Sequence, residues 1–126
     1  MKILLKTFII FSLFIFPSIS NAEWKFTSIN QNGVKMYVDF ERIRKKGNNV
    51  YFWILFDFKS SYEGYLSEVN YMQGDCEEFK YKILTGIFYR EQMGKGMSKT
   101  NTLENPQWGY PIPNSSAEET LQKVCK

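Results

Sequence analysis

The run from Val50 to Phe58 constrains the fold of this chain more than any other stretch. In VYFWILFDF every second residue is apolar, and these residues share one side of the strand. Tyr51, Trp53 and Leu55 lie between them, point to the other side, and are also large and apolar. A strand that is apolar on both sides is usually central in its sheet and covered on both faces. The chain therefore needs partner strands on each side of this one, and material packed over the sheet.

Four further segments alternate large apolar and polar residues, as half-buried strands do. Asn32-Gly33 is the strongest hairpin signal in the chain and joins the first two segments. Gly86 is predicted to bulge or split the last of them, because glycine weakens a strand interior. The predicted strands are residues 24–28, 34–39, 65–72 and 79–90.

Three other stretches lack a clear strand period. Residues 40–44 fit a helical turn, and residues 45–49 form a polar loop. Residues 93–114 contain three glycines and three prolines, and we expect a loop with at most one short strand near Trp108.

The C-terminal segment SSAEETLQKVCK predicts a helix. A serine followed three residues later by a glutamate is the capping-box spacing, and it occurs twice, from Ser115 and from Ser116. An apolar stripe at helical spacing includes Leu121 and Val124 and brings Cys125 to the side that faces the sheet.

The first 22 residues have the layout of a secretory signal peptide. A charged start is followed by the apolar run 7–16, then Pro17, then small residues ending at Ala22. The alternative is an uncleaved membrane anchor, which needs about 20 apolar residues and finds about half that number here. We expect cleavage between Ala22 and Glu23, no transmembrane segment after cleavage, and one domain over residues 23–126.

The chain has two cysteines, Cys76 and Cys125, and both lie after the predicted cleavage site. In an oxidising compartment two cysteines most simply form one disulfide. The alternatives are two free thiols or an intermolecular bond. A disulfide closing a loop of about 50 residues would stabilise the fold by roughly 4 kcal/mol on the chain-entropy model.

Composition excludes several classes of function. The net charge of +3 includes two lysines of the predicted leader, so the exported part is nearly neutral and we expect no nucleic-acid partner. The chain has no histidine, which excludes Ser-His-Asp and Cys-His catalysis and removes the commonest metal ligand. We expect no catalytic residues, no metal site and no cofactor.

Four cations within five residues form the first candidate partner surface. This basic run could meet an acidic protein, a sulfated glycan or lipid head groups. The alternative is a charged loop that keeps one end of the sheet soluble. The cations are Arg42, Arg44, Lys45 and Lys46.

The second side of the central strand is the other candidate partner surface. Tyr51, Trp53 and Leu55 would line an exposed aromatic patch on the face without the helix. Alternatively, they form a second small core under residues 92–114.

The order of several short motifs resembles the surface-adhesin protein E-like family of Gram-negative envelope proteins. Each motif is short, but together with the two cysteines they cover nearly all of residues 23–126. The motifs are W-x-F at 24–26, Y-V-D-F at 37–40, F-W-I-L at 52–55, G-D-C at 74–76, M-G-K-G at 93–96, W-G-Y-P-I-P-N-S at 108–115 and V-C at 124–125.

The residues themselves predict an α+β fold: a single antiparallel β-sheet of about five to six strands, a C-terminal α-helix packed on one face, and one disulfide. The resemblance implies the same fold and a disulfide matching Cys76–Cys125. It also implies a non-enzymatic role, because the founding type is a surface lipoprotein that binds host extracellular-matrix proteins. Glu23 stands where a lipid-anchored relative would carry its cysteine.

We therefore expect an exported bacterial envelope protein, in the periplasm or at the cell surface and not lipid-anchored. It would act by binding a protein partner, with host-matrix adhesion as one form and a homodimer left open. The alternative is a soluble periplasmic inhibitor or a small-ligand-binding protein.

Overall fold

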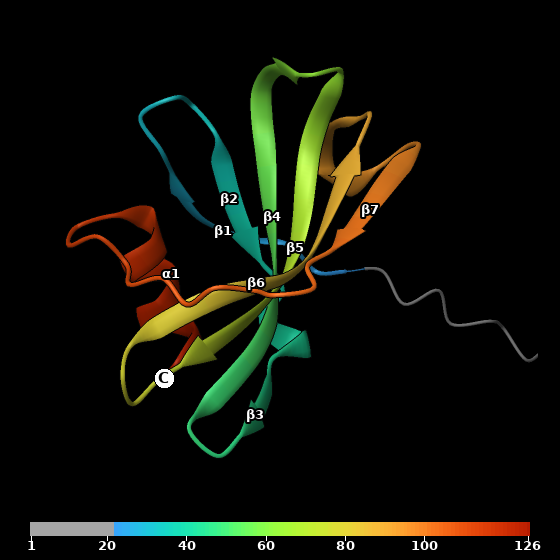
Figure 1. The fold of residues 1–126 in the computed structure, drawn as a ribbon. Helices are drawn as coiled ribbons and strands as arrows, with labels where there is room; N and C mark the ends of the chain where they lie inside the picture. Colours follow the sequence, from blue (N-terminus) through green and yellow to red (C-terminus); the bar gives the residue numbers. More distant parts are fainter. Residues whose placement is uncertain (1–21) are drawn as a thin grey trace, which may run out of the picture.

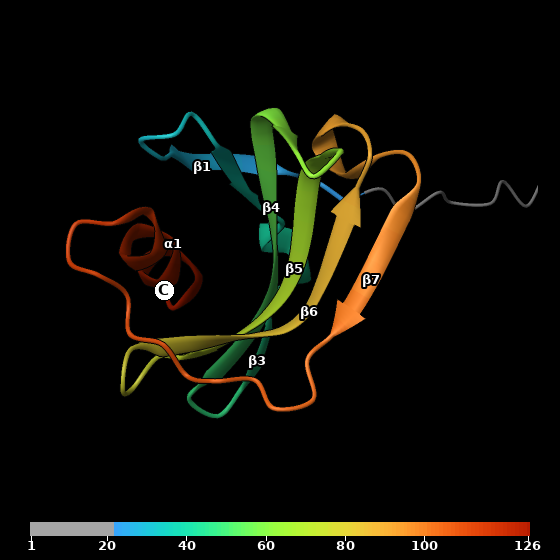
Figure 2. The same cartoon turned by 45° about the horizontal axis from the view of Figure 1, so that its top comes forward.

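The computed structural model describes residues 22–126 and shows one antiparallel sheet with a single α-helix on one face (Figures 1 and 2). The predicted leader lies outside the described residues, apart from Ala22. The strands are β1 Lys25–Ile29, β2 Lys35–Val38, β3 Arg44–Lys46, β4 Asn49–Tyr62, β5 Tyr65–Asp75, β6 Lys80–Tyr89 and β7 Ser98–Thr102. Two short 3-10 turns, η1 Phe40–Arg42 and η2 Gln92–Gly94, and the helix α1 Ser116–Val124 complete these described elements.

Six of the seven strands follow the order β1-β2-β4-β5-β6-β7 in the sheet. The seventh, β3, lies off this path and pairs with β4. Strand β4 spans the sheet: its first three residues pair with β3, and residues 54–57 pair with β2. Strands β4, β5 and β6 curve so that α1 lies on their concave side (Figure 2). The α+β prediction is confirmed, with seven strands in the sheet.

The predicted central strand is confirmed. Val50, Phe52 and Ile54 of β4 are 2, 2 and 3% exposed and form the core under the helix. Leu121 and Val124 of α1 are 2 and 1% exposed and close that core from above. Burial of these apolar side chains on both layers holds α1 on the sheet.

The start of α1 distinguishes between the two capping boxes. The Ser115 Oγ accepts a hydrogen bond from the Glu118 N–H at 3.2 Å, and the Glu118 carboxylate accepts one from the Asn114 N–H at 3.3 Å. Ser115 is therefore the N-cap, and Ser116 is the first helical residue.

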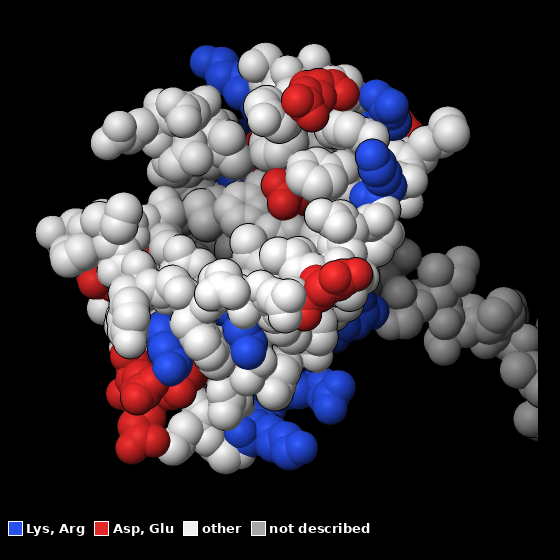
Figure 3. All heavy atoms as spheres, in the orientation of Figure 1, with Lys and Arg blue, Asp and Glu red and all other residues white. Residues whose placement is uncertain are grey.

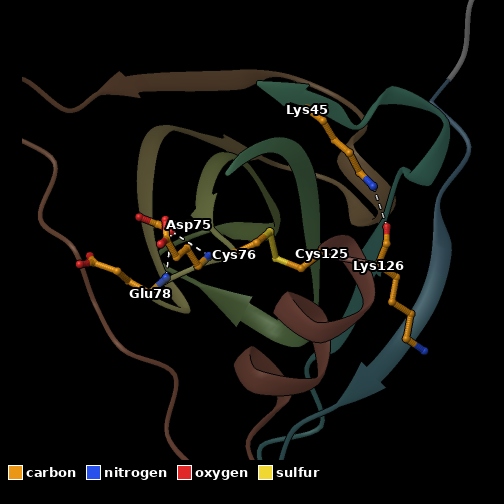
Figure 4. Close-up of a disulfide and its surroundings, with 7 residues drawn as sticks. Lys45, Asp75, Cys76, Glu78, Cys125 and Lys126 are labelled. Carbon is orange, nitrogen blue, oxygen red and sulfur yellow. Dashed lines mark hydrogen bonds between the residues drawn. A yellow bond between two sulfur atoms is a disulfide. The ribbon is translucent and has the colours of Figure 1, made fainter. Parts of the chain in front are cut away.

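The predicted disulfide is confirmed and fixes the end of the helix. Cys76, just after β5, is bonded to Cys125, the C-cap of α1, with the two Cα atoms 5.6 Å apart (Figure 4). The Lys45 Nζ donates a hydrogen bond to the Lys126 carbonyl oxygen at 2.7 Å, so β3 also holds the chain end.

Three local predictions were wrong. Residues 44–46, at the start of the expected polar loop, form β3, and residues 98–102 form β7 instead of a loop. The irregularity in β6 falls at Leu84, because Tyr71 pairs with Thr85 and the next β5 residue pairs with Ile83. All residues of β3 and β7 are exposed and polar, so neither strand shows an apolar period.

In the part of the chain that the structure describes, no helix is long and apolar enough to span a membrane. The same residues contain no group of three or more acidic, histidine or cysteine side chains that could hold a metal ion.

Candidate protein-binding surface

One row of side chains crosses four strands on the face opposite α1. Arg44 of β3 pairs with Tyr51 of β4, Tyr51 pairs with Gln73 of β5, and Gln73 pairs with Lys82 of β6. Residues that face each other across an antiparallel ladder point to the same side of the sheet. The register therefore places an arginine, a tyrosine and a lysine in one line on the face without the helix.

Three aromatic rings form the centre of this face. Tyr71 lies between Tyr51 and Trp53, with ring centroids 6.2 and 4.7 Å away. The three side chains are partly exposed. Close aromatic pairs on neighbouring strands limit side-chain motion and leave a firm apolar surface for contact.

Two lysines and a tryptophan extend the face beyond β6. The Lys80 and Lys82 Nζ atoms lie 4.7 and 4.3 Å from the centroid of the Trp108 ring, as cation–π pairs. Hydrogen bonds of 2.9 and 2.8 Å between Tyr81 and Gly109 hold the loop that carries Trp108 against β6. Trp108 remains 36% exposed.

We call this surface the aromatic–cationic face. It carries four cations and four aromatic rings from β3, β4, β5, β6 and the loop after β7. Its members are Arg44, Lys46, Tyr51, Trp53, Tyr71, Lys80, Lys82 and Trp108.

The face carries four cations, one of which, Lys80, forms an ion pair with Glu78. Arg44 and Lys46 are exposed, and in Figure 3 basic side chains gather at the lower end of the molecule, where Figure 1 places β3. Asp75 shares this side, and its Oδ1 accepts the N–H groups of Glu77 and Glu78, both at 3.0 Å. The Lys80 Nζ donates a hydrogen bond to the Glu78 carboxylate, which raises the pKa of Lys80.

The structure brings parts of the two predicted surfaces together. Arg44 and Lys46 of the basic run lie on the same side of the sheet as Tyr51 and Trp53, because β3 folds back on the start of β4. These two cations and two aromatic residues are thus parts of one surface.

Two of the predicted surface residues lie elsewhere. Leu55 is fully buried, under η2, so its assignment to an exposed patch was wrong. Lys45 pairs with Val50 and points to the helix side. Arg42 in η1 forms an ion pair with the buried Asp39 at 3.5 Å and lines a surface depression together with Trp53.

The covering of Leu55 shows that both predictions for this side were partly right. Residue Gly94 of η2 lies so close that a Cβ added there would be 3.2 Å from the Leu55 Cδ1. The Ser67 Oγ donates to the Glu91 carbonyl at 2.6 Å and accepts from the Gly94 N–H at 2.9 Å. A small second core therefore fills the upper part of this side, while Tyr51 and Trp53 lie beyond it.

Sequence reasoning missed four members of the face: Tyr71, Lys80, Lys82 and Trp108. The alternation Lys80-Tyr81-Lys82 within a predicted strand was a usable signal, since it sends both lysines to one side. The approach of Trp108 depends on the loop path after β7, which has no local sequence signal.

Comparison with known proteins identifies the relatives of this fold. A sequence model of the family described as Surface-adhesin protein E matches residues 24–126. Protein E of Haemophilus influenzae has a similar structure, with a TM-score of 0.67 and 17% identity over 86% of this chain and 88% of that one. A second crystal form of that protein gives a TM-score of 0.65 at 17% identity, over 86% of this chain and 91% of the other. No curated protein matches the chain significantly. At such identity the structural likeness shows a shared fold.

Proposed function

Because the chain belongs to the Surface-adhesin protein E family, we propose that it is a non-enzymatic binding protein of the bacterial envelope. Its partner is a protein with an acidic surface, and a host extracellular-matrix protein is the form of partner that the family suggests. The observation that carries this proposal is the aromatic–cationic face, which brings four cations and four aromatic rings together on one side of the sheet.

The composition of the face is that of a binding surface. Tyrosine, tryptophan and arginine are enriched among the residues that carry most of the binding energy at protein interfaces. Here the stacked rings are already ordered, so binding costs little side-chain entropy. The surrounding cations favour an acidic partner and make the association rate fall as salt is added.

The test is binding of the purified protein to a panel of extracellular-matrix proteins, with two charge-reversal variants of β3. Arg44→Glu reverses a charge on the face, and we expect binding about tenfold weaker, as for the loss of a charge contact of about 1.4 kcal/mol. Lys45→Glu makes the same change of net charge one residue away, on the other side of the sheet. We expect it to bind within about twofold of the unmodified protein.

Equal effects of the two variants would show that net charge, and not this face, determines binding. If no matrix protein binds, the same pair of variants is applied to acidic envelope proteins captured from the periplasm. Absence of binding in both sets would overturn the proposal.

We also propose that residues 1–22 are removed on export, leaving Glu23 as the first residue. Mass spectrometry of the exported protein measures its N-terminus directly, and a chain that retains any residue before Glu23 would contradict cleavage at this site. Protease treatment of intact cells, compared with release by osmotic shock, distinguishes the cell surface from the periplasm. Cleavage on intact cells supports adhesion to host proteins, and protection supports an envelope partner.

A further inference from the structure

A cavity of about 210 Å³ lies between α1 and the concave face of the sheet, on the opposite side from the aromatic–cationic face. Figure 3 shows a hollow on this side, between the helix and the upper strands. Most of its lining is apolar. The main apolar side chains are Phe52, Ile54, Phe56, Met72, Ile83 and Leu121.

Two buried polar atoms in the lining have no hydrogen-bond partner within the described chain: the Asn70 Oδ1 and the Thr120 Oγ1. Both residues are only 3% exposed. Buried polar atoms in folded proteins are nearly always hydrogen-bonded, so an unpartnered pair in one cavity marks a place where a bound molecule can supply the partners.

The chemistry of Asn70 determines what a ligand must present here. The unpartnered Asn70 atom is the side-chain carbonyl oxygen Oδ1, which accepts hydrogen bonds and cannot donate them. The ligand must therefore present a hydrogen-bond donor to Asn70. Glu68 is the next residue on the same side of β5.

Gly86 of β6 leaves the space that this geometry requires. It pairs with Asn70, and a Cβ added at Gly86 would lie 3.1 Å from the Asn70 Oδ1 and 3.7 Å from the Glu68 Oε1. A larger residue would crowd the Asn70 Oδ1, which lines the cavity. The Glu68 carboxylate lies close by and lines the neighbouring surface depression. Two oxygen acceptors thus lie near each other at the edge of the apolar cavity, and one belongs to an acid.

We propose that this cavity binds a small amphipathic amine, with its apolar body among the β4 side chains and its ammonium group at Asn70 and Glu68. A cavity of about 150 Å³ holds a benzene molecule, so the space here fits a phenyl ring with a short amine arm. The ammonium group donates to the Asn70 Oδ1 and is attracted by the Glu68 carboxylate. The site lies on the other side of the sheet from the proposed partner surface and does not depend on it.

The test compares phenethylamine with 2-phenylethanol and phenylacetate, titrated into the purified protein with its disulfide intact and followed by two-dimensional amide NMR. We expect phenethylamine to shift the amide signals around Asn70, Gly86 and Thr120. Phenylethanol should bind more weakly, and phenylacetate at least tenfold more weakly than the amine. Equal affinity for the amine and the acid would overturn the assignment of the ligand class.

Three variants test the site itself. Ala117→Leu fills the cavity from α1, where leucine is a good helix former, and should abolish binding in a protein whose other amide signals stay dispersed. Glu68→Gln keeps the shape and should remove the preference for phenethylamine over phenylethanol. Arg44→Glu, on the far side, should leave binding unchanged. Amine binding that persists in Ala117→Leu, or that Arg44→Glu removes, would place the ligand outside this cavity.

Discussion

At the scale of single residues, Gly74 of β5 marks a close contact between α1 and the sheet. A Cβ added there would lie 2.8 Å from the Leu121 Cδ1 and 3.0 Å from the Val50 Cγ2. Both atoms belong to the buried core, so neither can move without repacking its neighbours.

Gly74→Ala should therefore lower the free energy of unfolding by about 1–3 kcal/mol, because it overpacks the contact between helix and sheet. Urea denaturation followed by fluorescence measures the change. Gly109→Ala is the control, since its nearest neighbour would be 3.9 Å from the added Cβ. Equal stability of the two variants would mean that α1 shifts freely on the sheet.

Ionisation of the Glu68 carboxyl group lowers the free energy of unfolding, because the group is partly buried. Burial raises the pKa of its carboxyl group above the ordinary value of 4.5, and the hydrogen bond from Asn70 opposes that rise only in part. The folded state therefore keeps the proton to higher pH than the unfolded state, so stability falls as the pH rises from about 4.5 to the raised pKa. The nearby cations are Lys59, which lines the same surface depression as Glu68, and Lys99, which lies across Phe88.

Glu68→Gln should therefore raise the melting temperature at pH 7, and the gain should shrink as the pH falls from the raised pKa to about 4.5. Thermal unfolding by circular dichroism between pH 3.5 and 7.5 measures it. A gain that is constant with pH would show that packing, and not ionisation, is responsible.

At the scale of elements, the sequence identified most strands and the helix, and it failed where an element had no apolar period. Strand β4 was predicted because it carries apolar residues on both faces of the sheet. Strands β3 and β7 were missed because every residue in them is exposed, so pairing with a neighbour is what makes them strands. The helix was predicted because its cap and its apolar stripe are both local signals.

The choice between the two helix caps can be tested directly. Ser115→Ala removes the hydroxyl that accepts from the Glu118 N–H, and it should cost about 1 kcal/mol of unfolding free energy. Ser116→Ala changes the next residue, which lies inside the helix, and should be close to neutral, because alanine is the better helix former. Chemical denaturation of both variants measures the difference, and a larger loss for Ser116→Ala would move the cap by one residue.

At the scale of the whole molecule, the disulfide connects the C-terminal helix to the hairpin between β5 and β6. It joins residues 49 apart in the chain, so it restricts nearly half of the described residues in the unfolded state. Lys45 adds a second contact from β3 to the chain end. The helix that closes the proposed ligand cavity is therefore held at its last turn.

Replacing both Cys76 and Cys125 with serine should lower the free energy of unfolding by about 4 kcal/mol on the chain-entropy model. Amide hydrogen exchange should speed up most in α1, because the end of this helix is no longer covalently bonded to the turn after β5. Denaturant unfolding with and without a reducing agent is the measurement. The reducing agent should destabilise the unmodified protein by a similar amount and leave the variant unchanged; a variant as stable as the oxidised protein would refute the prediction.

The sequence by itself determined the α+β class, the central strand, the first hairpin, the C-terminal helix and the pair of bonded cysteines. These features follow from local signals: apolar period, turn residues, a cap and the count of cysteines. Only the tertiary structure decided which side chains share a surface. Strand register puts Arg44 beside Tyr51 and sends Lys45 to the other side, and the return of η2 buries Leu55. The cavity likewise forms only where α1 lies over Phe52, Asn70 and Ile83, because contacts between distant segments depend on how the sheet pairs and curves.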